Sequence, residues 1–307
     1  MDIPNVVFPV FAVILTGWLA GAFGYLPRSL AAPLVGFAYN VAMPALIFVT
    51  IAPEPVRGLL DWGFLAAFGG GSLLCFAGVF LVARARASRG VGSSAMLGAA
   101  ASMTNTGFVA LPILQAMYGP RGVLPAAIAT VFVAVAMFPV LIVLLEMDRG
   151  ARSERLHPLA LANRVVTNPL MISTILGLVW SIGGLPVPAF FRTYATIFAD
   201  ALTPCALFSI GLGLSLEGLR SNFVESAWLT ILKLVVMPLV VYGLCLACSV
   251  DPFYTVAAVV CAAVPTAKTA YVLAGEYRVE ERMVASTISI TTLLSVVTLL
   301  GWLYALS

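Results

Sequence analysis

Two short segments of this 307-residue chain place polar side chains beside proline within strongly apolar sequence. The first contains Asn105, Thr106, Gly107 and Pro112, and the second contains Pro265, Thr266 and Lys268. Proline interrupts the helical hydrogen-bond ladder, and Asn, Thr and Gly are weak helix formers. We therefore expect two helices to break at residues 105–108 and 264–267, with Pro112 and Pro265 as the helix breakers. Helices that restart there present unpaired N–H groups and positive dipole ends, which favour an anion.

Lys268 is the most unusual of these residues, because an ammonium group deep in an apolar segment is costly. Three interpretations are open: it supplies the counter-charge for a carboxylate substrate, it replaces a bound sodium ion, or it pairs with Asp200. Ordinary proline kinks would explain the breaks without any site, but two breaks beside polar residues favour a binding site. The predicted substrate contacts are Asn105, Thr106, Gly107, Thr266 and Lys268.

Three further polar residues in apolar sequence are predicted to support or couple this site. Asn40 and Asp200 each precede a proline by four residues, and Asp200 suits proton coupling if it takes up a proton. Lys233 either faces a carboxylate or is tied to a backbone carbonyl or an acid. We predict no metal site and no cofactor, because the five cysteines lie in apolar runs and the single histidine, His157, lies in a hydrophilic segment.

The composition excludes an ordinary soluble domain. Hydrophobic residues make up 62% of the chain and charged residues 9%, whereas soluble domains are roughly a quarter charged. Most of the chain falls into apolar runs of about 20 residues, long enough for a helix to cross a hydrocarbon layer. Backbone groups in lipid must be satisfied within the chain, and the alternation of a barrel strand is absent. The predicted class is an all-α integral membrane protein that contacts membrane lipid and no nucleic acid.

The chain repeats itself after a shift of 160 residues. The aligned residues include Gly17 with Gly177, Pro44 with Pro204 and Thr106 with Thr266. Five spans fall in each copy, an odd number, so the second copy must be inverted in the membrane, an arrangement typical of secondary transporters. The ten predicted spans are 5–25, 29–51, 60–83, 92–118, 122–147, 165–184, 189–216, 223–249, 252–276 and 282–305. The predicted organisation is a first repeat (1–147), a cytoplasmic linker (148–160) and a second repeat (161–307).

Basic residues are distributed unequally between the two sets of loops. Eleven lie in the loops that follow odd-numbered spans, namely Arg28, Arg84, Arg86, Arg89, Arg149, Arg152, Arg155, Arg164, Arg220, Arg278 and Arg282. Three lie in the opposite loops, namely Arg57, Arg121 and Arg192. Because basic loops stay in the cytoplasm, both termini are predicted to lie outside.

Five motifs resemble the auxin efflux carrier family, and their order and spacing cover nearly the whole chain. They are Tyr39–Phe48, Asn105–Pro112, Asn168–Ile172, Leu202–Gly211 and Lys233–Pro238. The chain lacks the long central loop of plant members and resembles a bacterial one, which implies the cytoplasmic (inner) membrane. The resemblance implies the ten-helix fold of bile acid–sodium symporters, in which broken spans 4 and 9 cross. It also implies a scaffold of spans 1, 2, 6 and 7, a transport domain of spans 3–5 and 8–10, carboxylate substrates near Asn105, and a homodimer. Plant members carry an asparagine on the second crossing helix, whereas Thr266 and Lys268 stand here.

These observations together predict a secondary transporter of a small organic anion. The substrate is a carboxylate, malonate-like or auxin-like, moved by alternating access of the elevator type, without sodium or with proton coupling. A sodium-coupled symporter of the bile acid type is the alternative. An intramembrane enzyme is disfavoured because no HExxH or GxSxG motif occurs, and a sensor is disfavoured because no signalling domain is appended.

Overall fold

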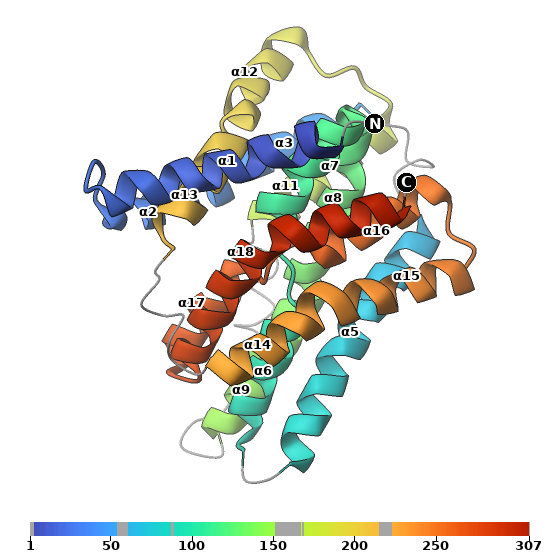
Figure 1. Cartoon of the computed structure of the whole chain (residues 1–307). Helices are drawn as coiled ribbons and strands as arrows, with labels where there is room; N and C mark the ends of the chain where they lie inside the picture. The colour runs from blue at the N-terminus through green and yellow to red at the C-terminus, as the bar shows by residue number, and fades with distance from the viewer. Residues whose placement is uncertain are drawn as a thin grey trace. The chain divides into compact units, whose positions relative to one another are not determined.

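The computed structural model describes residues 3–53, 61–86, 89–150, 167, 169–214 and 223–306, and the regular structure of these residues is helical (Figure 1). The predicted linker from residue 151 onward and His157 lie outside the described residues. Six helical segments are long and apolar enough to cross a membrane: Arg28–Val49, Trp62–Ala85, Pro120–Asp148, Ala189–Leu212, Val224–Ala247 and Glu281–Leu306. Shorter apolar helices are Phe8–Ala22, Thr106–Tyr118 and Pro252–Ala263. The prediction of an all-α integral membrane protein is confirmed at this level.

The chain divides into two compact units, and each takes segments from both halves of the sequence. Unit 1 comprises Met1–Asp61, Gly107–Val131 and Arg164–Leu214. Unit 2 comprises Trp62–Thr106, Phe132–Asn163 and Ser215–Ser307. The chain passes from unit 2 to unit 1 at residue 107 and back again after residue 131, so spans 4 and 5 of the prediction each contribute to both units.

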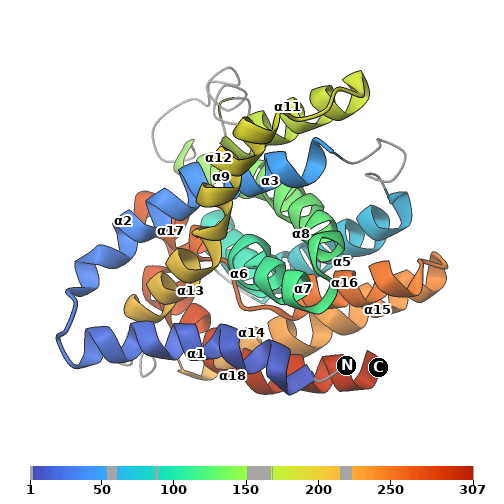
Figure 2. The same ribbon diagram turned by 90° about the horizontal axis from the view of Figure 1, so that it is seen from above.

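Unit 1 is built on helices that pack backbone against backbone. Its elements are α1 (Ile3–Ala22), η1 (Arg28–Leu30), α2 (Ala31–Phe37), η2 (Ala38–Ala42), α3 (Met43–Ile51), α7 (Leu111–Tyr118), α8 (Pro120–Phe132), α11 (Pro169–Gly183), α12 (Ala189–Asp200) and α13 (Leu202–Leu212). Helix α1 lies along α13 (Figure 2), and a Cβ on Gly211 would stand 1.7 Å from the carbonyl oxygen of Ile14. Helix α11 lies along α3, where a Cβ on Gly177 would stand 3.0 Å from Ile51. Small residues thus allow these helices their close approach.

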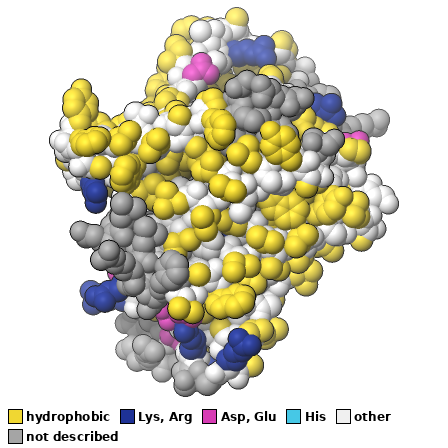
Figure 3. Space-filling view, in the orientation of Figure 1, with side chains coloured by type: hydrophobic (Ala, Val, Ile, Leu, Met, Phe, Trp, Pro, Cys, Tyr) yellow, Lys and Arg dark blue, Asp and Glu magenta, His cyan; other side chains and the backbone are white. Residues whose placement is uncertain are grey.

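Unit 2 contains the remaining helices, the second polar segment identified in the sequence, and the first polar segment as far as Thr106. Its elements are α5 (Trp62–Ala85), α6 (Val91–Ser102), η4 (Val133–Met137), α9 (Phe138–Gly150), α14 (Phe223–Ile231), η6 (Leu232–Val236), α15 (Met237–Ala247), α16 (Pro252–Ala263), α17 (Lys268–Tyr277) and α18 (Glu281–Leu306). Helix α16 packs against α5, α15 and α18, and α6 packs against α5 and α9. Figure 3 shows Lys and Arg side chains along the lower edge of the view, where the lower ends of α5, α6, α9 and α17 lie in Figure 1. Elsewhere on the face drawn, hydrophobic side chains predominate, as expected for a surface in lipid.

Four helical segments in the described part of the chain contain a wide, π-helical turn, and each turn ends two residues before a proline. The turns are η2, η3 (Thr106–Ala110), η4 and η6, and the prolines are Pro44, Pro112, Pro139 and Pro238. Proline lacks an N–H group, and its ring displaces the carbonyl four residues earlier, so the ladder opens there. After η6 the displaced carbonyl is that of Leu234, which accepts a 2.9 Å hydrogen bond from Trp302 Nε1 on α18.

Candidate functional site

The first polar segment interrupts its helix slightly earlier than the sequence predicts. Helix α6 ends at Ser102, Met103 is extended (φ −75°, ψ 121°), and helical structure resumes at Thr106. The break therefore covers residues 103–105, and the expected range 105–108 is corrected accordingly. Pro112 acts on the turn immediately before it, where it produces the π-helical η3, and so it does not itself make the break.

The second polar segment lies between α16 and α17. Helix α16 ends at Ala263, Val264 and Ala267 are extended (ψ 160° and 134°), and α17 begins at Lys268. Pro265 lies within this extended stretch, so here the proline coincides with the interruption.

The two extended segments cross as a minimal antiparallel ladder. Thr104 and Thr266 form the bridge, Asn105 N donates to the carbonyl of Pro265 at 2.9 Å, and Ala267 N donates to the carbonyl of Met103 at 3.0 Å. Thr104, Asn105 and Thr266 are all buried. Each extended segment therefore supplies hydrogen-bond partners for backbone groups of the other segment. Irregular backbone at membrane depth requires such partners, because no water is present there to replace them.

The hydroxyl of Thr266 caps the first broken helix. Its Oγ1 donates to the carbonyl of Ala100 at 2.7 Å, and its N–H donates to Thr291 Oγ1 of α18 at 3.3 Å. Ala100 lies in the last turn of α6, where carbonyls have no helical partner. Thr266, predicted as a substrate contact, thus holds the crossing together.

The hydroxyl of Thr104 is buried and has no hydrogen-bond partner among the residues that the structure describes. A buried polar group without a partner is costly, so an unpaired hydroxyl at the crossing marks a candidate ligand contact. Sequence reasoning did not select Thr104. Its only signal was its place beside Asn105 in the polar segment.

Lys233 is tied to the other broken helix. It belongs to η6, its side chain is 0% exposed, and its Nζ donates to the carbonyls of Ala262 and Val264 at 2.5 and 2.7 Å. Of the two interpretations left open by the sequence, the structure therefore places Lys233 against backbone carbonyls.

Lys268 is the first residue of α17 and is partly exposed. Its preceding residue, Ala267, makes no side-chain cap for the helix. A cation is unfavourable at the positive end of a helix dipole, by about 0.3–1 kcal/mol. The positive charge of Lys268 and the positive N-terminal end of the α17 dipole lie at the same place, so together they favour an anion there.

The remaining predicted residues lie elsewhere. Gly107 belongs to unit 1, where a Cβ would stand 2.5 Å from Met43 Cε, so its absence of a side chain serves packing. Asn40 is exposed in η2 and donates to the carbonyl of Gly36 at 2.8 Å. Asp200 is the exposed last residue of α12 in unit 1. An Asp200–Lys268 pair would join the two units and stays a prediction.

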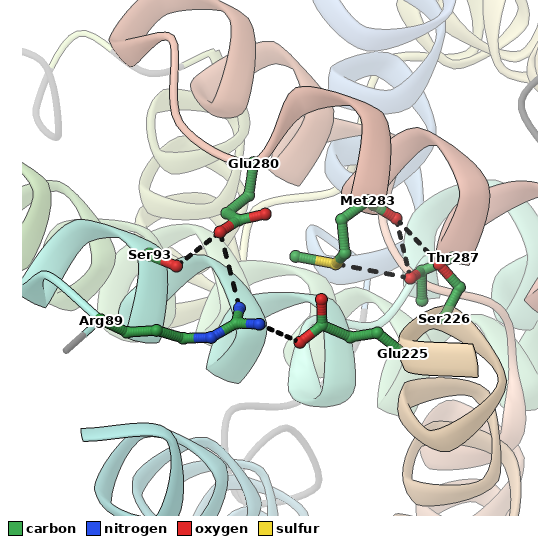
Figure 4. A network of polar contacts seen from close by, with 7 residues as sticks. All are labelled: Arg89, Ser93, Glu225, Ser226, Glu280, Met283 and Thr287. Carbon is green, nitrogen blue, oxygen red and sulfur yellow. Dashed lines mark hydrogen bonds and ion pairs between the residues drawn. The ribbon is translucent and has the colours of Figure 1, made fainter. Parts of the chain in front are cut away.

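A second polar cluster, which the sequence did not indicate, links three segments of unit 2 (Figure 4). Arg89 Nη2 lies 2.8 Å from Glu225 Oε1 of α14, and Arg89 Nη1 lies 3.5 Å from Glu280 Oε1. Ser93 of α6 donates to the same Glu280 oxygen at 2.6 Å. The ion-paired side chains are between 25% and 37% exposed, so the ion pairs contribute at most about 1 kcal/mol each. Among the described residues, no group of His, Cys, Asp and Glu side chains is arranged to hold a metal ion.

Similarity to known proteins shows the family of this chain. The sequence matches the family described as membrane transport protein over residues 3–303. The chain belongs to this family. The resemblance to auxin efflux carriers, drawn from five motifs, is confirmed, because this is the auxin efflux carrier-like family of membrane transport proteins.

Relatives of this membrane transport protein match along nearly their whole length. A proposed malonate transporter of Rhizobium meliloti (strain 1021) is 29% identical over 305 residues, which cover 99% of this chain and 95% of the relative. An uncharacterized transporter of Methanothermobacter thermautotrophicus is 27% identical over 309 residues, 98% of each chain. The uncharacterized transporter YfdV of Escherichia coli K12 is 24% identical over 302 residues, 96% of this chain and 95% of the relative. The protein is thus a multi-span member of a transporter family, which argues against an enzyme.

Proposed function

We propose that this protein is a secondary transporter of a small organic anion, with its binding site at the crossing of the two broken helices. The observation that carries the proposal is Lys268 at the first position of α17, directly after the ladder between Thr104 and Thr266. An ammonium group and a helix N-terminus both attract an anion, and either alone would be a weaker indication.

The proposed contacts are the side chains of Asn105, Thr106, Thr266 and Lys268, with the unpaired hydroxyl of Thr104 added from the structure. A carboxylate suits these groups because it accepts several hydrogen bonds and carries a charge opposite to that of the Lys268 ammonium. The name of the Rhizobium relative makes malonate the first compound to try. Gly107 remains a proposed neighbour of the substrate through its position in the chain.

We further propose that the fold is a ten-helix inverted repeat. The register of the crossing supports this, because Asn105 and Pro265 are equivalent after the 160-residue shift and are hydrogen-bonded to each other. A two-fold axis through such a pair is what an inverted repeat requires. Two helix contacts in unit 1 support the repeat independently. Gly177 packs on Ile51 where α11 meets α3, and the 160-residue shift relates Gly177 to Gly17 and Ile51 to Gly211. Gly17 and Gly211 both lie in the contact between α1 and α13.

The two compact units suggest how alternating access would work. Unit 1, which holds most of predicted spans 1, 2, 6 and 7, would be the scaffold, and unit 2 would be the moving transport domain of an elevator. The chain changes unit at residues 107 and 132, inside η3 and beside η4, and π-helical turns are frequent at functional sites. Asn40 and Asp200, both exposed in unit 1, would support or couple this movement.

The proposed setting is the cytoplasmic membrane of a bacterium, as a homodimer with both termini outside. Arg86 and Arg278 belong to loops of unit 2 that the basic asymmetry assigns to the cytoplasm, and Arg84 lies in the last turn of α5 beside the first of these loops. A cysteine introduced at Arg86 should react with a membrane-impermeant thiol reagent only after the cells are opened. Reaction of that cysteine in intact cells, without reaction of one at Ser307, would reverse the orientation.

Binding of malonate to the purified protein tests the proposed site. Small mono- and dicarboxylates should raise the melting temperature of the wild-type protein, and Lys268→Ala should abolish the shift. Lys268→Arg should weaken it, because a planar guanidinium replaces a compact ammonium. Arg86→Ala, which removes an exposed charge from a loop, is the matched control and should bind normally. Unchanged carboxylate affinity in Lys268→Ala would remove the basis of the proposal.

A further inference from the structure

The buried ammonium of Lys233 has an unusual set of partners. Its Nζ touches two backbone carbonyls, those of Ala262 and Val264, at 2.5 and 2.7 Å. The ion pairs found among the described residues join Arg89 to Glu225 and Glu280, and none of them involves Lys233. The charge of Lys233 is therefore compensated mainly by peptide dipoles.

Those dipoles come from the end of a broken helix. Helix α16 stops at Ala263, so the carbonyls of its last turn have no helical donor, and together they form the negative pole of the helix. Carbonyls at the C-terminal end of a half-helix and in an unwound segment are the groups that coordinate alkali cations in membrane transporters. Ala262 lies in the last turn and Val264 in the unwound segment, so Lys233 meets both kinds.

The position of Lys233 is enforced by its own helix. It lies in η6, and the ladder of that helix is opened by Pro238, while Trp302 of α18 takes up the displaced carbonyl of Leu234. A lysine is a four-carbon chain ending in a compact cation, so it delivers a point charge without the geometric demands of arginine. The side chain is 0% exposed, which excludes a role as a surface charge.

We infer that Lys233 is a tethered cation that fills a monovalent-cation site made by the carbonyls of Ala262 and Val264. The crossing of unit 2 is consequently complete without a bound ion, and removal of the Lys233 side chain opens a site for sodium. This goes beyond the proposed function and does not depend on the identity of the substrate. It also assigns to Lys233 the sodium-replacing role that the sequence suggested for Lys268.

Thermal unfolding of the purified protein in sodium chloride and in choline chloride at equal ionic strength tests the inference. The wild type should melt at the same temperature in both salts. Lys233→Ala should melt lower in choline and recover roughly 2–4 °C in sodium, with a saturable concentration dependence, because a ligand of the native state stabilises it. Lys233→Met should melt lower and show no recovery, because its thioether fills the space without providing charge.

Each other outcome counts against the inference. A saturable sodium effect on the wild type would show that the cation site is open. A folded Lys233→Ala protein that responds equally to sodium and choline would show that no site was created. Lys233→Ser, whose hydroxyl adds an oxygen ligand, is the second variant if the alanine variant does not accumulate. Failure to isolate either variant even in concentrated sodium chloride would also overturn the inference, since sodium is expected to take the place of the ammonium.

Discussion

Thr104 and Thr266 offer a matched pair for measuring what holds the crossing together. They are bridge partners and both are buried, but Thr266 Oγ1 donates to the carbonyl of Ala100 at 2.7 Å while Thr104 Oγ1 has no partner. Valine has nearly the shape of threonine without the hydroxyl. We expect Thr266→Val to lower the free energy of unfolding by about 1–3 kcal/mol, because a buried carbonyl loses its donor. Thr104→Val should leave it unchanged or raise it by up to about 1 kcal/mol, because an unsatisfied hydroxyl disappears.

Thermal unfolding of both variants in one detergent measures the difference. At roughly 2–4 °C per kcal/mol for a chain of this size, Thr266→Val should melt several degrees below Thr104→Val. Carboxylate binding should separate the variants in the opposite sense, with Thr104→Val losing affinity at full stability. Equal melting temperatures, or a lower one for Thr104→Val, would refute the assignment of Thr266 as the cap of α6.

Two further predictions concern contacts away from the crossing. Trp302→Phe should destabilise unit 2 by about 1–3 kcal/mol, since the carbonyl of Leu234 loses its indole donor. In a Pro238→Ala background the same change should cost less, because the new N–H at 238 can satisfy that carbonyl. Gly211→Ala should destabilise unit 1 by about 3 kcal/mol or more, since its Cβ would stand 1.7 Å from the carbonyl oxygen of Ile14.

The controls for these two predictions use the same thermal assay. Gly78→Ala, with nothing within 4 Å of its Cβ, should be neutral or stabilising by up to about 1 kcal/mol. Equal effects of Gly78→Ala and Gly211→Ala would contradict the close approach of α1 and α13. Strict additivity of Trp302→Phe and Pro238→Ala would contradict the shared carbonyl, because independent sites add and coupled ones do not.

The sequence predicted an all-helical membrane protein and the two interrupted segments, because both depend on local chemistry. Long apolar runs can only be membrane helices, and residues such as Pro265 disturb the helix in which they lie. The limits of the first break were less accurate. Pro112 marks the π-helical turn that precedes it, whereas the extended residues from Met103 to Asn105 are set by pairing with a segment some 160 residues away.

The roles of single polar residues were harder to predict, since each depends on a distant partner. The sequence around Thr266 predicts a ligand contact, whereas in the structure its hydroxyl donates a hydrogen bond to the carbonyl of Ala100. The sequence around Lys233 was equally compatible with a carbonyl and a carboxylate as its partner. The partners are carbonyls at the end of α16, about thirty residues later in the chain. Thr104 carried no signal beyond its place beside Asn105, and the Arg89 cluster carried none, because an unpaired hydroxyl and an ion pair between distant segments are visible only in three dimensions.

The ladder at the crossing has a consequence for how such proteins diversify. Its two hydrogen bonds join main-chain atoms, so most side chains at positions 104 and 105 can change without altering the path of either helix. A combinatorial library at Thr104, Asn105 and Lys268 should therefore yield many folded members, and at the proposed binding site these members should differ in carboxylate selectivity. Position 266 should tolerate far less variation in the same library, because the hydroxyl of Thr266 donates the hydrogen bond that the carbonyl of Ala100 accepts.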